Sequence, residues 1–379
     1  METNSRYDAV FAVLEHAVAR GVTPGAVAYV ARRGAVEYHE AHGVLASHPD
    51  SDVCGVPVTR HTRFDLSSLT KVLATTSIAA RYVSEGRMSL GEPLPRPFHE
   101  GYPEATLRDL LEHCAGFAAH RPFYAREDHR GRSALLRAVA RAAPDYPTRA
   151  RAVYSDLGFM VLGAWLEYVG GDRLDRLFRR EMAAFIHHDD TTVPTLGFRP
   201  TEFGTLSWRD ERDVAPTEVY EEAARADPTA SHVAFRRMHH SVAHGVVHDD
   251  NAFVMDGVAG HAGLFGTAQA VADVAAGWLY GTMPGLDVSV RDIFWRPSEV
   301  SGSVRRLGWD GVELDGQGST GDALSAGSVG HLGFTGCSVW IDPMCEGIYV
   351  LLTNRVHPSR GDLEDIRGLR RAFHGAAAR

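Results

Sequence analysis

A serine and a lysine three residues apart, Ser68 and Lys71, are the residues of this chain whose types and spacing most directly suggest catalysis. Lys71 is the only lysine among the 39 lysine and arginine residues. A desolvated lysine can release its proton and act as a base, whereas an arginine stays charged. Because residues i and i+3 share one face of a helix, the spacing predicts a serine nucleophile beside an amine base. The competing interpretation is a surface lysine near a serine that caps a helix.

A second candidate is the tyrosine of Tyr154-Ser155-Asp156, a motif that comes just before a predicted helix. A phenol near a lysine can take the proton from Ser68 and pass it to a leaving group. Taken alone, the motif favours a half-buried tyrosine at the start of a helix that Asp156 caps.

The third candidate is the segment His331-Leu332-Gly333-Phe334-Thr335-Gly336, which is predicted to lie inside a strand. Closely spaced glycines weaken a strand unless something must approach its backbone. A substrate acyl group that docks along the strand edge would be such a partner, and a strand N–H would then help to bind an oxyanion. Taken alone, the glycines favour a bulge or bend in an edge strand.

The elements that must position these motifs follow from apolar periodicity and from glycine and proline punctuation. The N-terminal part predicts a helix, a hairpin, a third strand and a second helix, at residues 5–20, 26–31 with 35–41, 62–66 and 68–84. The middle part predicts helices at 107–113, 133–142, 157–169 and 268–280. Strands return at 329–341 and 348–354, and a last helix follows at 363–374.

This order of elements predicts an α+β protein. Strands at both ends with helices between them indicate a sheet domain made of residues 1–88 and 277–379. A mainly helical domain, residues 89–276, is then inserted between the two halves of the sheet domain. With 379 residues and 44% apolar composition, the chain can bury a large core.

Charge and hydropathy exclude several classes of partner. The net charge of −9 argues against nucleic acid, because phosphate binding needs a cationic face. No stretch approaches the roughly 20 uninterrupted apolar residues that span a bilayer, and the first five residues, Met-Glu-Thr-Asn-Ser, lack the pattern of a secretory signal. We therefore expect a soluble, cytoplasmic protein that binds neither nucleic acid nor membrane.

The three motifs, in this order, resemble those of the serine β-lactamase and penicillin-binding-protein superfamily, in its class C-like branch of esterases and transacylases. The resemblance extends over most of the chain from about residue 25 to 360. The segments that carry it are Phe64–Lys71, Leu110–Phe117, Tyr154–Gly163, Val247–Phe265, Gly330–Pro343 and Leu351–Pro358.

The resemblance implies a role for each matching position. Ser68 would be the acylated nucleophile, Lys71 its base and Tyr154 a member of the proton relay. The backbone N–H groups of Ser68 and Phe334 would form the oxyanion hole, and His331 would stand where relatives often carry lysine. The implied fold is β-lactamase/transpeptidase-like, with an antiparallel sheet flanked by helices, an inserted all-helical domain, and the site between them.

The sequence departs from the family pattern at two places. Asp156 replaces the asparagine of β-lactamases, and His331-Leu332-Gly333 replaces their Lys-Thr-Gly. The carboxylate of a β-lactam or a D-Ala peptide needs a cation at position 331, which a mostly neutral histidine does not supply. The nearby Asp156 also repels that carboxylate. Antibiotic hydrolysis and peptidoglycan chemistry are therefore disfavoured. Asp156 would either pair with Lys71 and raise its pKa, or bind a polar or cationic substrate group.

Two further groups of histidines were considered. His240, His244 and His248 recur at i, i+4 and i+8, a spacing that suits metal ligands on a helix, but the resemblance places residues 247–251 in a loop and implies no metal. We therefore expect neither metal nor cofactor. His261, between Gly260 and Gly263, is either a residue that lines the cleft or a structural histidine between glycine turns.

These observations predict an acyl-transfer enzyme that forms an acyl-enzyme on Ser68 and hydrolyses an ester or amide of a small molecule. The alternative is a biosynthetic transacylase that passes the acyl group to an amine or alcohol in a natural-product pathway. A true β-lactamase and a catalytically silent binding protein are less favoured, the latter because Ser68, Lys71 and Tyr154 are all present.

Overall fold

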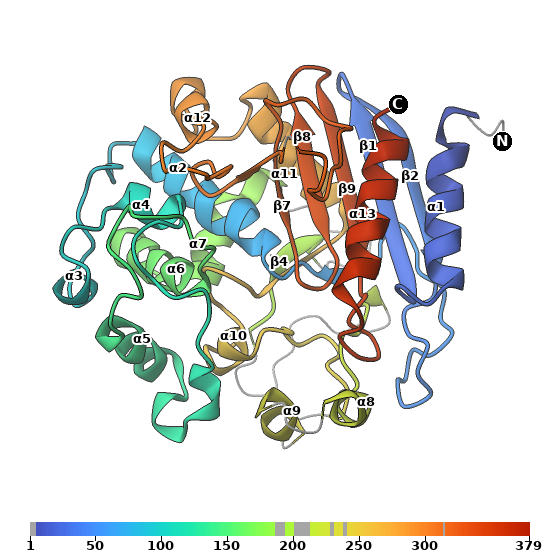
Figure 1. Ribbon diagram of the computed structural model, residues 1–379, viewed down its shortest axis with the longest axis horizontal. Coiled ribbons are helices and arrows are strands. Elements are labelled where there is room, and N and C mark those ends of the chain that lie inside the picture. Colours follow the sequence, from blue (N-terminus) through green and yellow to red (C-terminus); the bar gives the residue numbers. More distant parts are fainter. Residues whose placement is uncertain (1–4, 186–193, 201–212, 228–230, 238–240, 314) are drawn as a thin grey trace.

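A six-stranded antiparallel sheet forms the centre of the computed structural model, which describes residues 5–185, 194–200, 213–227, 231–237, 241–313 and 315–379 (Figure 1). The strand order is β2-β1-β9-β8-β7-β6. The strands are β1 (Gly25–Arg32), β2 (Ala35–Gly43), β6 (Asp310–Gly311), β7 (Val329–Leu332), β8 (Ser338–Asp342) and β9 (Gly347–Thr353). Strands from both ends of the chain therefore share one sheet, because β1 pairs with β9 from Ala26↔Thr353 to Arg32↔Gly347.

Both faces of this sheet are covered by helices. Along β1, alternate side chains point to opposite faces, and each set joins a different apolar cluster. Helices α1 (Asp8–Ala19) and α13 (Leu363–Ala377) pack against each other over one face, and α11 (Ala268–Tyr280) packs over the other against β1, β8 and β9. The sheet is therefore buried on both sides, which explains why β9 is buried at every position.

The middle of the chain is mainly helical and lies to one side of the sheet (Figure 1). Its longest helix within this part is α6 (Asp156–Gly170), which starts directly after Tyr154 and Ser155. The remaining helices of the whole described chain are α2 (Ser77–Ser84), α3 (Phe98–Gly101), α4 (Leu107–Leu111), α5 (Arg132–Arg141), α7 (Leu174–Glu181), α8 (Tyr220–Ala226), α9 (Ser231–Arg236), α10 (Asp250–Val254) and α12 (Val288–Phe294). Short 3-10 turns are η1 (Ser5–Tyr7), η3 (Phe123–Ala125), η4 (Glu127–His129) and η5 (Ala183–Phe185).

A small second sheet leads into the serine motif. Its order is β3-β5-β4, from strands β3 (Phe64–Asp65), β5 (Leu264–Gly266) and β4 (Leu196–Phe198). After β3 the chain turns through Ser67 and Ser68 into η2 (Lys71–Thr76), a π-helical segment that continues as α2. The predicted strand and helix are thus both present, and the helix begins with a π-helical turn of the kind often found at functional sites.

The glycine-rich third motif differs from the prediction. Residues 329–341 were expected to form one strand, but they form the hairpin of β7 and β8. Gly336 has φ +103°, which favours glycine, and the turn is closed by the Gly333 N–H, which donates to the Cys337 carbonyl at 2.7 Å. The two glycines therefore mark a turn between strands rather than a continuous substrate-binding edge.

The division into a sheet domain and an inserted helical domain stays a proposal. Helix α11, which covers the sheet, spans the expected boundary at residues 276 and 277. Within the described ranges, no helix combines the length and the apolar character that a membrane crossing requires. The predicted cytoplasmic location stays a prediction.

Candidate active site

The turn that carries Ser68 is fixed by a buried carboxylate. Asp65 accepts hydrogen bonds from the Ser67 N–H at 2.8 Å and from the His248 N–H at 2.6 Å. Burial raises the pKa of Asp65 to about 6, although these two N–H groups act in the opposite direction. Asp65 thus joins the turn before Ser68 to the loop that begins at Val247, and Ser67 is held at φ +49°.

Lys71 lies directly behind Ser68, and its side chain is fully buried. The Nζ atom donates to Ser68 Oγ at 3.0 Å, to Asp156 Oδ1 at 2.8 Å and to the carbonyl oxygen of His261 at 3.4 Å. A lysine ammonium has three donors, and here each donor has an acceptor. The contacts therefore fit a protonated lysine.

The charge of Lys71 is set by its pairing with Asp156. Burial alone lowers the pKa of Lys71, but the carboxylate of Asp156 and the phenol of Tyr154 outweigh burial and raise it. Burial alone would raise the pKa of Asp156. Lys71, His120 and His261 outweigh burial and hold the pKa of Asp156 well below its usual range. The contacts and the direction of the pKa shift therefore favour a charged Lys71, and its predicted role as a neutral base stays a prediction. Of the two roles left open for Asp156, the structure has the ion pair.

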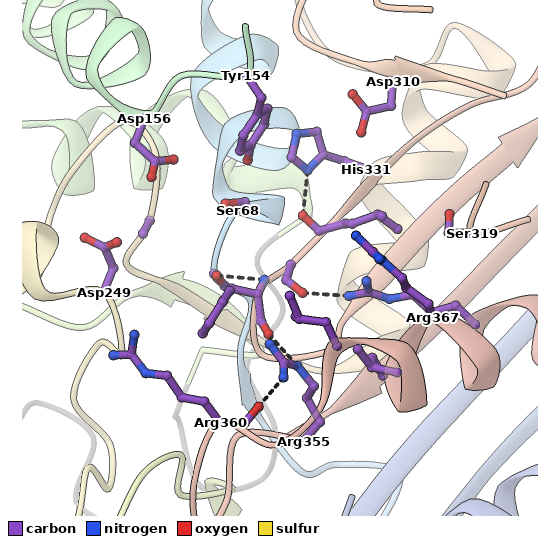
Figure 2. A pocket seen from close by; sticks show the side chains of 18 of the residues that line it. Ser68, Tyr154, Asp156, Asp249, Asp310, Ser319, His331, Arg355, Arg360 and Arg367 are labelled. Atoms are coloured by element: carbon purple, nitrogen blue, oxygen red, sulfur yellow. Dashed lines mark hydrogen bonds between the residues drawn. The ribbon is translucent and has the colours of Figure 1, made fainter. Parts of the chain in front are cut away.

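Two cations lie close to the ring of Tyr154. Lys71 Nζ is 4.6 Å from the centre of the tyrosine ring, and the guanidinium carbon of Arg305 is 5.0 Å from it on a different segment of the chain. Figure 2 shows the hydroxyl of Tyr154 pointing toward Ser68. A negative charge that develops on this hydroxyl during a proton transfer would be stabilised by both cations.

Two buried histidines complete the surroundings of Tyr154. The ring centres of His113 and His331 lie 4.8 and 5.7 Å from that of Tyr154. Burial, reinforced by Arg305 and Lys71, holds the pKa values of both histidines well below 6.5, so both are neutral. His331 Nδ1 donates to the Leu332 carbonyl at 2.9 Å, which leaves Nε2 as an acceptor without a partner among the described residues.

Asp156 and Asp249 lie on the side of Ser68 that is opposite His331 (Figure 2). His261 Nε2 is 2.9 Å from Asp249 Oδ1, and His120 Nδ1 is 3.6 Å from Asp156 Oδ2. Asp156 raises the pKa of His120 above its ordinary value. His261 is buried and does not line the cleft; it supports Asp249, which does. His261 therefore has the position of a structural histidine rather than that of a residue that lines the cleft.

The oxyanion hole differs from the arrangement that the resemblance implied. The Phe334 N–H donates to Ser67 Oγ at 3.2 Å. The Ser68 N–H has no acceptor among the described residues. Of the two predicted N–H donors, one is thus free and the other is engaged by a neighbouring hydroxyl.

These groups lie in a cleft of about 960 Å³ between the helical part and the C-terminal part of the chain. Gly333 lines it, and a Cβ at this position would lie 2.8 Å from the Leu66 carbonyl, so the hairpin turn approaches the serine turn as closely as a glycine allows. Six arginines line the C-terminal side of the cleft: Arg305, Arg355, Arg360, Arg367, Arg370 and Arg371.

The histidines considered as metal ligands do not converge. His239 and His240 lie outside the described residues. His244 Nε2 is 2.9 Å from the Val214 carbonyl, while the His248 ring stacks on Phe334. The described ranges contain no group of three or more histidine, cysteine or acidic side chains placed to hold a metal ion.

Sequence reasoning brought the three motifs together correctly in space but missed Arg305, His120, Asp249 and Arg355. None of these residues belongs to one of the three motifs. Asp249 could have been noticed as an aspartate that comes directly before a helix, since its side chain caps the helix that begins at Asp250. Arg305 had no such signal, because its approach to Tyr154 depends on how the chain after α12 returns to the sheet.

A family profile described as beta-lactamase matches residues 10–372 of the chain. Among curated proteins, the N-acetylmuramyl-L-alanine amidase of Bacillus subtilis (strain 168) is 29% identical over 382 residues, which cover 93% of this chain and 82% of the amidase. A putative D-alanyl-D-alanine carboxypeptidase of Escherichia coli (strain K12) is 27% identical over 354 residues, which cover 86% of this chain and 77% of that protein.

Solved structures with the same architecture cover nearly the whole chain. EstCE1, described as a hydrolase with promiscuous acyltransferase activity, has a TM-score of 0.72 at 21% identity, over 98% of this chain and 99% of its own. Unliganded simvastatin synthase (LovD) from Aspergillus terreus has a TM-score of 0.71 at 17% identity, over 99% and 98%. At these identities the likeness shows the fold, and it confirms the antiparallel sheet flanked by helices that the sequence predicted.

Proposed function

The chain belongs to the beta-lactamase family, and from this premise we propose that it hydrolyses an ester or amide of a small molecule through an acyl-enzyme on Ser68. The observation that carries the proposal is the arrangement at the cleft floor. Ser68 Oγ accepts a hydrogen bond from Lys71 at 3.0 Å, and the Tyr154 hydroxyl points toward it (Figure 2). A serine hydroxyl that contacts the Lys71 ammonium and lies near the Tyr154 hydroxyl, which can relay its proton, is suited to nucleophilic attack.

Because Lys71 already carries its full set of protons, Tyr154 is the group that moves the proton. Ser68 Oγ attacks the carbonyl carbon and gives its proton to the Tyr154 oxygen, while Tyr154 gives its own proton to the leaving oxygen or nitrogen. In the second half, water attacks the acyl carbon, its proton passes to Tyr154, and Tyr154 returns a proton to Ser68. Tyr154 is thus neutral before and after each half of the reaction.

In this scheme Lys71 acts through its charge. Its ammonium stabilises the negative charge that develops on Ser68 Oγ and on the Tyr154 oxygen, and Arg305, near the same ring, contributes a second positive charge. Asp156 keeps Lys71 protonated. The sole lysine of the chain is therefore an electrostatic group rather than a free base.

The cleft also changes the argument against carboxylate-bearing substrates. The missing lysine at position 331 and the nearby Asp156 both disfavour such substrates, but Arg305 and Arg355 bring cations to the cleft from outside the motif. Arg355 pairs with no carboxylate in the described part of the chain, and burial together with Arg360 lowers its pKa to about 10, so it stays charged. β-Lactams and D-alanyl peptides therefore belong in the substrate panel beside simple esters.

The size of the cleft supports a second candidate, transfer of the acyl group to an amine or alcohol. Small-molecule sites commonly measure about 300–1,000 Å³, so a cleft of about 960 Å³ has room for an acyl group and an acceptor together. An acceptor bound in this way competes with water through its position.

Turnover of p-nitrophenyl butyrate tests the proposal, with Ser68→Ala as the matched control. We expect p-nitrophenol release by the wild type and none above background by the variant. Hydroxylamine or an added amine then separates the two candidates, because diversion of product from butyrate to the hydroxamate or amide favours transfer. Equal release by wild type and Ser68→Ala would contradict an acyl-enzyme on Ser68.

A further inference from the structure

Ser67, the residue directly before the nucleophile, lines the cleft and accepts a hydrogen bond from the Phe334 N–H, the group that the resemblance assigned to the oxyanion hole. We propose that the Ser67 hydroxyl is itself an oxyanion-hole donor, polarised from behind by the Phe334 N–H, so that the second donor of this site is a side chain rather than a backbone amide. The inference rests on the proposed acyl-transfer function and adds one catalytic residue to it.

The hydrogen bond between Ser67 and Phe334 gives the direction of this relay. The Phe334 N–H donates to Ser67 Oγ at 3.2 Å, so Ser67 Oγ is the acceptor. The hydroxyl hydrogen of Ser67 has no acceptor among the described residues, and Ser67 is one of the residues that line the cleft. A hydroxyl that accepts one hydrogen bond becomes a stronger donor for the next, because successive hydrogen bonds polarise one another.

The backbone at Ser67 indicates that its side chain has a use. Its φ of +49° lies in the left-handed region, which a glycine adopts readily and a serine adopts at a cost. Asp65 holds the Ser67 N–H at 2.8 Å and so fixes this conformation. A strained conformation that neighbouring groups enforce next to a nucleophile points to a function of the residue that bears it.

The packing around Ser67 keeps its hydroxyl in place. The hairpin turn comes so near that a Cβ on Gly333 would lie 3.5 Å from Ser67 Cβ and 2.8 Å from the Leu66 carbonyl. Ser67 itself is only 7% exposed. The hydroxyl is therefore positioned before substrate arrives, as a donor must be if it is to stabilise a developing charge without reorganisation.

In the reaction, the Ser68 Oγ–carbon bond forms and the electron pair of the carbonyl double bond moves onto the substrate oxygen. That oxygen then accepts hydrogen bonds from the Ser68 N–H and from the Ser67 hydroxyl. When the leaving group departs, the pair returns to re-form the carbonyl, and Ser67 keeps its proton throughout.

Two variants test the proposal together. Ser67→Ala removes the hydroxyl and keeps a Cβ, while Ser67→Gly also relieves the left-handed backbone. We expect both to lower kcat for p-nitrophenyl butyrate by at least about tenfold with little change in KM, because a single oxyanion donor is worth about 10²–10³ in kcat where no other group can substitute. Affinity for an alkyl boronic acid, which mimics the tetrahedral anion on Ser68, should fall by a similar factor.

The outcomes separate this inference from the proposed function. If the wild type acylates on Ser68 but Ser67→Ala and Ser67→Gly turn over as fast as it does, or faster, the hydroxyl is not a donor and the Phe334 N–H serves directly. If only the alanine variant is slow, the backbone conformation and not the hydroxyl is responsible, which also overturns the proposal. If the wild type itself never acylates on Ser68, the proposed function fails instead.

Discussion

Lys71 and Asp156 form a buried ion pair, with Nζ and Oδ1 2.8 Å apart, and the same Nζ lies 3.0 Å from the Oγ of Ser68. This relationship decides how the site works. Asparagine at position 156 would leave a buried amine whose desolvation favours the neutral form, whereas aspartate keeps the ammonium. In the proposed mechanism Lys71 is therefore a fixed positive charge, and the proton moves through Tyr154.

Replacing Asp156 by asparagine tests this pair. In Asp156→Asn, burial is left to lower the pKa of Lys71, so the pH profile of kcat/KM should gain an ionisation below about pH 10 that the wild type lacks. The measurement is the rate of p-nitrophenyl butyrate hydrolysis across pH, corrected with Ser68→Ala at each pH. Asp249→Asn, which keeps the Lys71–Asp156 pair, is the control. Identical profiles for wild type and Asp156→Asn would contradict the pairing.

Removing Arg305 tests whether the second cation near the Tyr154 ring contributes to catalysis. Arg305→Met keeps an apolar stem over the ring and removes the charge, and we expect kcat to fall about tenfold, which corresponds to about 1.4 kcal/mol of transition-state stabilisation. Arg305→Lys should retain part of the rate. Asp310→Asn is the matched control, because it removes the acidic partner of Arg305 and leaves the cation. A wild-type rate in Arg305→Met would remove Arg305 from the account.

A methyl group at Gly333 should damage both stability and activity. The added Cβ would lie 2.8 Å from the Leu66 carbonyl, and a backbone atom cannot move aside as a flexible side chain can. We expect Gly333→Ala to lower the free energy of unfolding by about 1–3 kcal/mol and to reduce kcat, because the serine turn must shift. Chemical denaturation and ester hydrolysis measure the two effects. Gly327→Ala, where a Cβ would meet only the Ser325 hydroxyl at 4.0 Å, should be close to neutral on both.

The pair of His120 and Asp156 predicts a pH dependence of stability. The folded-state pKa of His120 is raised above its ordinary value of 6.5, so its contribution to stability is complete below that value and is lost as pH rises through the folded-state pKa. The Tm of the wild type should therefore exceed that of His120→Gln by more at about pH 6 than at about pH 9. The same comparison in an Asp156→Asn background should show no such trend. A gap that widens at high pH would reverse the sign and refute the pairing.

Most of the fold was predictable because local signals agreed with the tertiary structure. The glycine after residue 20, the continuous apolar run at 26–31 and the helical stripe of 268–280 each indicate the element that forms. The stretch from 329 to 341 misled, since apolar residues on both sides of Gly333 and Gly336 read equally well as one strand or as two. Only the position of β9, which pairs with β8 over five residues, fixes the register of the hairpin.

For the site, spacing alone placed Ser68 beside Lys71, because a helical turn enforces that contact. The charge state of Lys71 could not be predicted in the same way, because it depends on Asp156, which lies 85 positions away in the sequence. The sequence left open whether Asp156 pairs with Lys71 or binds a polar or cationic substrate group, and only tertiary contacts choose between these roles. Arg305 could not be predicted for the same reason, since the sequence around a loop arginine does not indicate that it will contact the ring of Tyr154.

The most direct test of the account is the mass of the protein after brief exposure to p-nitrophenyl butyrate and acid quench. We predict an increase equal to one butyryl group, located by peptide mapping on the segment that contains Ser68 and absent in Ser68→Ala. Turnover of the ester with no such adduct at any quench time, or an adduct that persists in Ser68→Ala, would contradict acyl transfer through Ser68.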